Sequence, residues 1–383
     1  MSTRSSTEPI FDHGYWMTEA IELARDAMAL AHPNPRVGAV VVKDGILVGR
    51  GFHAFDRLDH AEIVALDQAG PKAAGASLYV NLEPCSHAGR TGPCTKAIIA
   101  AGVKKVYAAM KDPNSLVSGR GFAELRHAGI EVHIGIYEPY AKETNEDFAK
   151  WIRTQLPFLT LKAALTLDGQ IAQRAGRTTA ISGPASRQLV QHLRHRADAL
   201  LTGIGTILAD DPLLTDRSKK PRRRRLLRAV VDSRLRLPLR SQLVRSARHD
   251  VLVFTTRSVE SPKARALARS GVEVFRAPGR AGRVDLREVI RELGRRQMLN
   301  VLLEAGAALN GSALEAGLVD KLVLFYAPRI IGAGGVPLAQ LPSRSFAKSP
   351  PLSNVTLERC EPDFVVEGYF HDVYRDHRRR GKN

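Results

Sequence analysis

Three side chains that bind soft metal ions lie near the start of the chain. His60 is followed by Cys85 and Cys94, and a proline precedes each cysteine. One histidine and two cysteines would hold a zinc ion and leave its fourth position open to water, as catalytic zinc sites do. Bound zinc lowers the pKa of such a water to about 7. Glu62 is a carboxylate that the metal does not need, so it could carry protons from the attacking water to a leaving amine.

The spacing of these residues is typical of zinc deaminases that act on nucleobases. A lone His-x-Glu often marks only a helix start, but two Pro-Cys pairs downstream favour a metal site. A structural zinc site would need a fourth ligand, for which His87 is the candidate. Free-base and nucleic-acid deaminases usually carry Pro-Cys-x-x-Cys, whereas eight residues separate Cys85 from Cys94 here. The longer loop brings Arg90 and Thr91 near the metal, and Arg90 could bind a substrate phosphate or remain a solvated charge.

The composition indicates a protein of two domains without disulfides. The 383 residues are 44% hydrophobic and 25% charged, which suffices for two cores. Cys360 is the one cysteine outside the metal motif, so a disulfide framework is not expected, which suits a reducing cytosol. Because no run of about 18 apolar residues occurs, we expect no membrane-spanning helix and no membrane partner. Residues 1–14 lack the apolar core of a signal peptide, so we expect a disordered extension and a cytoplasmic location.

The formal net charge of +18 raises the question of a nucleic-acid partner. Much of the excess lies in two runs, the loop 219–225 and the basic tail 375–383. Neither run has interleaved aromatic residues that could stack on bases. We therefore interpret both as solvated and do not expect nucleic acid as a partner. A phosphate-bearing substrate or an adventitious contact with RNA is the alternative.

Hydrophobic spacing predicts alternating helices and strands around the metal motif. A helix is expected over 15–31, followed by a hairpin of strands over 37–42 and 46–52. Positions i and i+2 do not share a helix face, so His60 and Glu62 can serve one site only in the first turn of a helix. Later in this half, strands are expected over 77–82, 104–110 and 130–136, and helices over 60–68, 94–100 and 121–128. This alternation favours a sheet with helices on both faces.

The second half predicts another α/β unit. A charged amphipathic helix over 138–156, before Pro157, is interpreted as a packing helix that connects the domains. Strands are expected over 158–165, 198–202, 226–231, 251–254, 272–275, 300–304, 319–326 and 364–370, and helices over 184–196, 263–270, 285–296 and 311–316. The Rossmann fingerprint G-x-G-x-x-G is absent. Gly-rich corners at 202–206 and 304–312 could offer backbone N–H groups to a phosphate, or could simply allow tight packing.

Seven motifs follow one another in a recognisable order. They are His-Pro-Asn-Pro-Arg-Val-Gly at 32–38, His-Ala-Glu at 60–62, the two Pro-Cys pairs, Leu-Thr-Leu-Asp-Gly at 165–169, Thr-Ile-Leu-Ala-Asp-Asp-Pro at 206–212, Val-Asp-Ser at 231–233 and Glu-Ala-Gly at 304–306. Together they resemble the bifunctional deaminase–reductase family of riboflavin biosynthesis, from about residue 15 to about residue 374.

The resemblance implies an α/β fold class with two different domains. A cytidine-deaminase-like three-layer α/β/α domain would span 15–140, and a dihydrofolate-reductase-like α/β domain would span 158–374, with a connecting helix over 141–157. The first would hydrolyse the exocyclic amine of a diamino-pyrimidinone ribosylamino phosphate. The second would then reduce the ribosyl group to a ribityl chain with NADPH. The implied cofactors are Zn²⁺ and NADPH, the implied partner is the phosphorylated pyrimidine, and we expect a homo-oligomer.

The resemblance also assigns roles to individual residues. In the first domain His60, Cys85 and Cys94 hold zinc, Glu62 carries protons, and Asn34 and His53 contact the pyrimidine or its sugar. In the second domain the substrate contacts are Lys162, Thr178, Arg194, Arg217 and Glu304. The NADPH side comprises Leu165, Ala180, Thr206, Asp210, Ser233, Gly306, Ala307, Ala308, Leu309, Asn310, Gly311 and Ser312.

The chain departs from the family pattern at three places, of which Ser115, in place of a proline after Asn114, should have little consequence. Arg57-Leu58-Asp59 stands where Gly and Pro usually precede the histidine, so Asp59 either perturbs the metal site or faces solvent. Ala180 stands where an aromatic residue often flanks the nicotinamide. Two alternative functions stay open. The first is a zinc deaminase that acts on RNA or another nucleotide and whose second domain is inactive. The second is a non-enzymatic basic binding module in which zinc only stabilises the fold.

Overall fold

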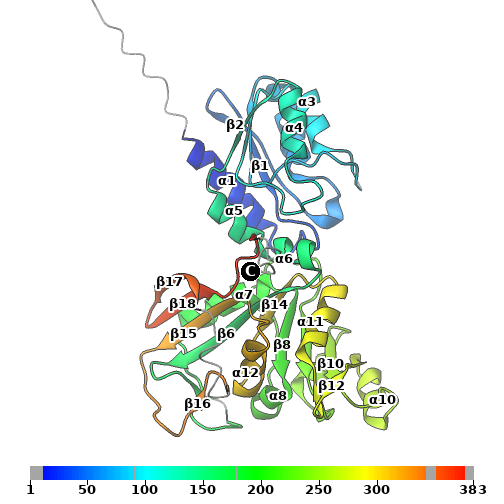
Figure 1. Cartoon of the computed structure of the whole chain (residues 1–383), viewed down its shortest axis with the longest axis vertical. Coiled ribbons are helices and arrows are strands. Elements are labelled where there is room, and N and C mark those ends of the chain that lie inside the picture. Colours follow the sequence, from blue (N-terminus) through cyan, green and yellow to red (C-terminus); the bar gives the residue numbers. More distant parts are fainter. Residues whose placement is uncertain (1–11, 90, 178, 342–350, 376–383) are drawn as a thin grey trace, which may run out of the picture. The chain divides into compact units, whose positions relative to one another are not determined.

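The computed structural model of the chain describes residues 12–89, 91–177, 179–341 and 351–375. The chain divides into two units, Met1–Arg153 and Thr154–Asn383, which we call the first and second unit (Figure 1). Two candidate substrate residues, Arg90 and Thr178, lie outside the described residues. So does most of the expected N-terminal extension and of the basic tail. None of the described helices is long and apolar enough to cross a membrane.

The first unit is built on a five-stranded sheet in the order β2-β1-β3-β4-β5. Its strands are β1 (Gly38–Lys43), β2 (Ile46–Phe52), β3 (Ser77–Val80), β4 (Lys105–Ala108) and β5 (Glu131–Ile134). Its helices are α1 (His13–Asp26), α2 (Ala61–Ala69), α3 (Cys94–Ala100), α4 (Arg120–His127), α5 (Glu138–Thr144) and α6 (Glu146–Thr154), with short 3₁₀ turns η1 (Phe55–Arg57) and η2 (Gly70–Ala73). Strand β1 runs antiparallel to β2 and β3, whereas β3, β4 and β5 are parallel.

Close approach of α2 to β2 fixes where the metal-binding turn begins. A Cβ atom at Gly49 would lie 2.0 Å from the carbonyl oxygen of Ala65, and one at Gly51 would lie 2.6 Å from that of Ala61. Both oxygens belong to the backbone of α2, which cannot move aside alone. The two glycines therefore allow α2 to lie directly on the strand.

The second unit is built on a nine-stranded sheet in the order β11-β10-β9-β8-β14-β6-β15-β18-β17. Strands from β11 to β15 are parallel, and β18 and β17 are added antiparallel. The strands are β6 (Phe158–Thr166), β8 (Ala199–Gly203), β9 (Leu227–Val231), β10 (Val251–Thr255), β11 (Val272–Arg276), β14 (Asn300–Leu303), β15 (Lys321–Ala327), β17 (Ser353–Cys360) and β18 (Asp363–Tyr369). Two small ribbons pair β7 (Gln170–Ala172) with β16 (Val336–Pro337), and β12 (Gly279–Arg280) with β13 (Arg283–Val284).

Helices cover both faces of this sheet, so successive strand residues enter different cores. The helices are α7 (Pro184–Arg196), α8 (Ile204–Asp210), α9 (Gln242–Arg245), α10 (Pro262–Arg269), α11 (Leu286–Arg295) and α12 (Ala307–Glu315). Leu252 and Phe254 of β10 belong to the core that contains α11 and α12 residues. Val251 and Val253 belong to the core that contains α8, α9 and α10 residues.

Two expected helices differ from the structure, and the strand at the sheet edge was missed. The helix expected over 138–156 is broken at Asn145 into α5 and α6, and both belong to the first unit up to Arg153. Helix α1 ends at Asp26, well before the expected residue 31, and the chain then turns towards the loop 32–38. Strand β17 was not expected at all.

Candidate active sites

The first candidate site lies where α2 and α3 begin. His60 is the N-cap residue of α2, and Cys94 is the first residue of α3. His60 Nδ1 lies 3.1 Å from Cys94 Sγ and 3.4 Å from Cys85 Sγ, and all three ligand atoms lie within 4.8 Å of one another. Tetrahedral zinc would separate such atoms by about 3.5–3.8 Å. This donor set therefore fits zinc, with a small adjustment.

Glu62 lies in the first turn of α2, the one placement in which it can share a site with His60. Its side chain is only 3% exposed, and this burial raises its pKa to about 7. A carboxyl group with that pKa can both accept and release a proton near neutral pH. A hydrogen bond from Cys94 lowers the pKa of Cys85 to about 4 and raises the pKa of Cys94, so Cys85 is ready as a thiolate ligand.

Asn34 and His53 form a hydrogen-bonded pair beside this cluster. The Asn34 amide nitrogen lies 2.9 Å from His53 Nε2, and His53 Nδ1 lies 2.9 Å from the carbonyl oxygen of Asp59. Since that carbonyl can only accept, His53 donates from Nδ1 and accepts from Asn34 at Nε2. The His53 ring stands edge-on to His60 with ring centres 5.3 Å apart. The side chain of Asp59 is exposed, and its backbone oxygen is what supports the pair.

Glu83 is a supporting residue that the sequence analysis did not single out. Its buried carboxylate accepts hydrogen bonds at 2.8–3.4 Å from the backbone N–H groups of Asp112, Gly119, Gly121 and Phe122. These bonds tie the Glu-Pro-Cys turn to the loop before α4 and to the first turn of that helix. The turn that presents Cys85 is therefore rigid.

The second candidate site is a cavity of about 1310 Å³ in the second unit. It runs along the carboxyl ends of β8, β9, β10 and β14, where open parallel sheets bind their ligands. Of the expected residues, the following line it: Lys162, Thr206, Asp210, Ser233, Glu304, Gly306, Ala307, Ala308, Leu309 and Ser312.

Several expected residues of the second unit lie elsewhere. Leu165 is buried in the core, and Ala180 and Arg217 are exposed without lining the cavity. Asn310 is fully buried and donates to the carbonyl oxygens of Ala305 and Leu338, at 3.1 and 2.9 Å. A Cβ at Gly311 would lie 2.0 Å from the backbone oxygen of Gln340. Asn310 and Gly311 therefore fix the start of α12 rather than face the cavity.

Glu304 joins two cations at one end of the cavity, which Lys162 and Glu304 line and Arg194 does not. Arg194 makes a two-point contact with its carboxylate at 2.8 and 3.0 Å, and Lys162 Nζ lies 3.7 Å away. Burial alone would raise the pKa of Glu304, but the charges of Lys162 and Arg194 together lower it. Burial lowers the pKa of Lys162. Two cations and one anion leave a net positive charge, which suits a phosphorylated substrate.

The sequence analysis missed a set of arginines at the other end of the cavity. They follow β9 and β10 or belong to the β12–β13 ribbon, and they are Arg234, Arg236, Arg257 and Arg283. Among the described residues, no carboxylate forms an ion pair with any of these four side chains. Unpaired arginines in a cavity are suited to an anionic ligand. Their sequence signal is weak because they come from three separate segments.

The interpretation of the loop 219–225 as solvated is wrong for Arg222. Its guanidinium donates to the carbonyl oxygen of Ala197 at 2.7 Å and pairs with Asp216 at 2.8 Å. Helix α7 ends with backbone carbonyls that lack intrahelical partners, and an arginine is a natural donor to them. Asp216 also lies 3.0 Å from His195 Nδ1. This part of the basic loop is thus a structural attachment to α7.

These features define a class of protein: a zinc-dependent deaminase joined to a reductase. Residues 11–110 match the family model of the cytidine and deoxycytidylate deaminase zinc-binding region, and residues 157–366 match that of the RibD C-terminal domain. The riboflavin biosynthesis protein RibD of Aquifex aeolicus is 40% identical over 92% of this chain and 96% of its own length. That of Escherichia coli is 39% identical over 92% and 98%.

Two solved structures agree. RibD of Acinetobacter baumannii has a TM-score of 0.82 and 37% identity, and covers 93% of this chain and 98% of its own. The diaminohydroxyphosphoribosylaminopyrimidine deaminase/5-amino-6-(5-phosphoribosylamino)uracil reductase of Thermotoga maritima has a TM-score of 0.79 and 34% identity over the same shares. The chain therefore belongs to the RibD family of riboflavin biosynthesis proteins.

Family membership confirms the main expectations. The fold class is a cytidine-deaminase-like α/β domain followed by a dihydrofolate-reductase-like α/β domain. The chain is a bifunctional enzyme with deaminase and reductase activities, and its cofactors are zinc and NADPH. Neither an inactive second domain nor a purely structural zinc site is supported.

Proposed function

We infer that the chain catalyses two consecutive steps of riboflavin biosynthesis. The first is hydrolytic deamination of a diamino-pyrimidinone ribosylamino phosphate, and the second is reduction of the ribosyl group of the product to ribityl by NADPH. One observation carries this inference: the zinc-ligand cluster with buried Glu62 and the large cavity around Glu304 occur in one chain. The full-length relative of Thermotoga maritima, which carries both activities in its name, supports it.

For deamination, His60, Cys85 and Cys94 would hold zinc, which when bound supplies a Lewis acid and makes water nucleophilic near neutral pH. Glu62 takes the proton of the attacking water and returns it to the leaving amine, a role that suits a pKa of about 7. Asn34 orients the pyrimidine because its amide nitrogen is bound to His53 and its amide oxygen can then accept from a ring N–H.

For reduction, bound NADPH would supply a hydride to the anomeric carbon, whose bond to the ring oxygen breaks while that oxygen takes a proton from solvent. Lys162, Arg194 and Glu304 bind the sugar phosphate part of the substrate. The corner from Gly306 to Leu309 forms the first turn of α12 and faces the cavity, so the N–H groups of Gly306, Ala307 and Ala308 suit the cofactor's pyrophosphate. Thr206, Asp210 and Ser233 line the same cavity on the cofactor side.

We also propose that the enzyme works in the cytoplasm as a homo-oligomer. Zinc binding needs reduced Cys85 and Cys94, which a reducing compartment supplies. Strand β17 lies at the edge of the nine-stranded sheet, and its Val355 and Leu357 are 56% and 69% exposed. An exposed apolar edge strand favours pairing with another copy of the chain.

The change Glu62→Gln tests the order of the two reactions in the zinc-loaded enzyme. We expect ammonia release from the diamino substrate to fall by about a hundredfold or more, because the proton carrier is lost. NADPH consumption with that substrate should fall equally, since reduction needs the deaminated product. With the deaminated substrate supplied directly, NADPH consumption should be normal. Normal ammonia release by Glu62→Gln with zinc bound would contradict the assigned role, and NADPH loss without deamination would contradict the order.

A further inference from the structure

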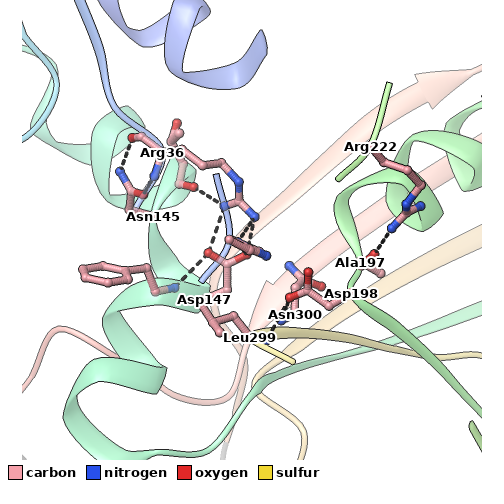
Figure 2. Close-up of polar contacts among 11 residues, drawn as sticks. Arg36, Asn145, Asp147, Ala197, Asp198, Arg222, Leu299 and Asn300 are labelled. Atoms are coloured by element: carbon pink, nitrogen blue, oxygen red, sulfur yellow. Dashed lines mark hydrogen bonds and ion pairs between the residues drawn. The ribbon is translucent and has the colours of Figure 1, made fainter. Parts of the chain in front are cut away.

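The loop that carries Asn34 is held by a buried ion pair that the proposed reactions do not use. Arg36 and Asp147 are both fully buried, and the guanidinium contacts both carboxylate oxygens at 2.8 and 2.6 Å (Figure 2). The carbonyl oxygen of Thr144, the last residue of α5, accepts a further hydrogen bond from Arg36 at 2.6 Å. The Nε2 atom of His32, in the same loop as Arg36, also lies 2.7 Å from the guanidinium. The junction of α5 and α6 therefore supplies most of the contacts of this one side chain.

The same junction also forms hydrogen bonds with the backbone of Arg36. The side chain of Asn145 accepts from the N–H of Arg36 at 2.8 Å and donates to its carbonyl oxygen at 2.9 Å (Figure 2). Asn81, just after β3, donates to that oxygen at 2.9 Å and accepts from the N–H of Gly38 at 2.9 Å. Neutralising a buried charge would require only the side-chain contact. Four bonds to the backbone instead determine the path of the loop.

That path leads directly to the deaminase site. Asn34 lies two residues before Arg36, and its amide nitrogen is 2.9 Å from His53 Nε2. His53 in turn stands edge-on to His60, with ring centres 5.3 Å apart. A shift of the backbone at Arg36 would therefore move Asn34 relative to His53 and to the metal ligands, without touching those ligands.

We propose that the α5–α6 junction, comprising Thr144, Asn145 and Asp147, is a positioning element of the deaminase site. Asn145 and Asp147 hold Arg36 and thereby orient Asn34 for the pyrimidine. This inference rests on the proposed function, in which Asn34 contacts the substrate. It assigns to the segment 138–154 a part in deamination beyond the packing and connecting roles that its sequence suggests.

A double-mutant cycle in the full-length, zinc-loaded enzyme tests the proposal. The variants are Asn145→Ala, Asn34→Ala and the double variant, and the measurements are zinc content and the kcat and KM of ammonia release. We expect each single variant to raise KM by about three- to tenfold with zinc content unchanged. The double variant should be no worse than Asn34→Ala alone, because Asn145 acts through Asn34.

Two controls accompany the cycle. Gln68→Ala removes another amide side chain that bonds to a backbone N–H of the first unit, that of Arg50 at 2.7 Å, and should leave KM unchanged. If Asn145→Ala does not fold, Arg36→Lys replaces it, because lysine keeps the charge and loses the two-point contact with Asp147. NADPH consumption with the deaminated substrate reports separately on the second unit.

The outcomes separate two kinds of failure. The proposal would be overturned if the increases in KM of the two single variants multiply in the double variant. It would also be overturned if Asn145→Ala has a normal KM but yields less folded or less zinc-loaded protein. In either case the junction would only stabilise the fold. If Asn34→Ala itself leaves KM unchanged, the substrate contact assigned to Asn34 in the proposed function is wrong, and the inference falls with it. If KM is raised in both single variants and is not raised further in the double variant, the result supports both the substrate contact of Asn34 and the positioning role of the junction.

Discussion

Two glutamates with little solvent exposure play opposite parts in this enzyme because their neighbours differ. Glu62 is removed from solvent, and burial raises its pKa to about 7. Burial acts on Glu304 as well, but Lys162 and Arg194 reverse the effect and lower its pKa. The first carboxyl can therefore exchange a proton at neutral pH, while the second stays ionised and holds its two cations in place.

The four unpaired arginines of the cavity predict how the enzyme prefers NADPH to NADH. The two cofactors differ only by the ribose 2′-phosphate, an anion that needs a cationic site. We expect Arg257→Ala and Arg283→Ala each to raise the KM for NADPH by about tenfold, with little change for NADH. Steady-state kinetics of the reduction of the deaminated substrate measure the KM for NADPH and the KM for NADH.

Arg291→Ala is the matched control, because Arg291 lies on the surface of α11 and its side chain is 49% exposed. It should change neither constant. Equal losses with NADPH and NADH in the cavity variants would show that these arginines bind a part common to both cofactors.

At the scale of elements, the segment after α8 is attached to α7 by several hydrogen bonds, and the carboxylate of Asp216 bonds to two of the side chains involved. Asp216 contacts His195 at 3.0 Å, Arg222 at 2.8 Å and the backbone N–H of Ser218 at 2.8 Å. The neighbouring carbonyl of Thr215 accepts from Arg194 at 3.1 Å. The attachment therefore supports the arginine that contacts Glu304.

Asp216→Asn should weaken this attachment and loosen Arg194. We expect the KM of the reductase substrate to rise by about three- to tenfold, since an ion pair that is mostly buried loses its charge. Ammonia release by the first unit should not change. Glu273→Gln serves as control. It removes the ion pair that Glu273 forms with Arg296 at a distance of 2.6 Å, and neither residue lines the cavity. If kcat of Asp216→Asn falls while KM stays constant, the attachment does not act by supporting the residues that contact the substrate.

Local elements could be predicted from sequence where helical periodicity begins at a proline, as at Pro93 and Pro184. The expected bounds 94–100 and 184–196 match α3 and α7. Strand β17 escaped prediction because its apolar residues Val355 and Leu357 are exposed, so burial imposes no clear pattern. The break at Asn145 is equally invisible, because the side chain of this residue bonds to Arg36, 109 residues earlier.

The same limit applies to the sites. The zinc ligands could be predicted because their residue types are chemically distinctive and close in sequence. The arginines of the cavity could not, because only the order of strands in the sheet brings β9 and β10 side by side and sets the β12–β13 ribbon against them. Asn310 and Gly311 were expected on the cofactor side, but a glycine-rich corner does not reveal which residues face the ligand.

At the scale of the whole molecule, each unit carries its own sheet and its own candidate site, so the remaining question is how copies of the chain assemble. Within the described residues, β17 pairs with β18 alone and leaves its other edge free. Leu357→Lys places a charge on this edge, a device that blocks pairing between strands. We expect sedimentation velocity to detect an oligomer for the unchanged chain and a smaller species for Leu357→Lys.

The control for this prediction is Leu116→Lys in the first unit, where the leucine is 72% exposed. It adds the same charge without touching β17, so the oligomer should persist. Because the two candidate sites lie within single units, ammonia release should continue in the smaller species of Leu357→Lys. An unchanged sedimentation coefficient in Leu357→Lys would mean that the copies meet through another surface. The exposed edge would then need protection by its irregular register between Ser353 and Thr356 or by its charged neighbours Glu358 and Arg359.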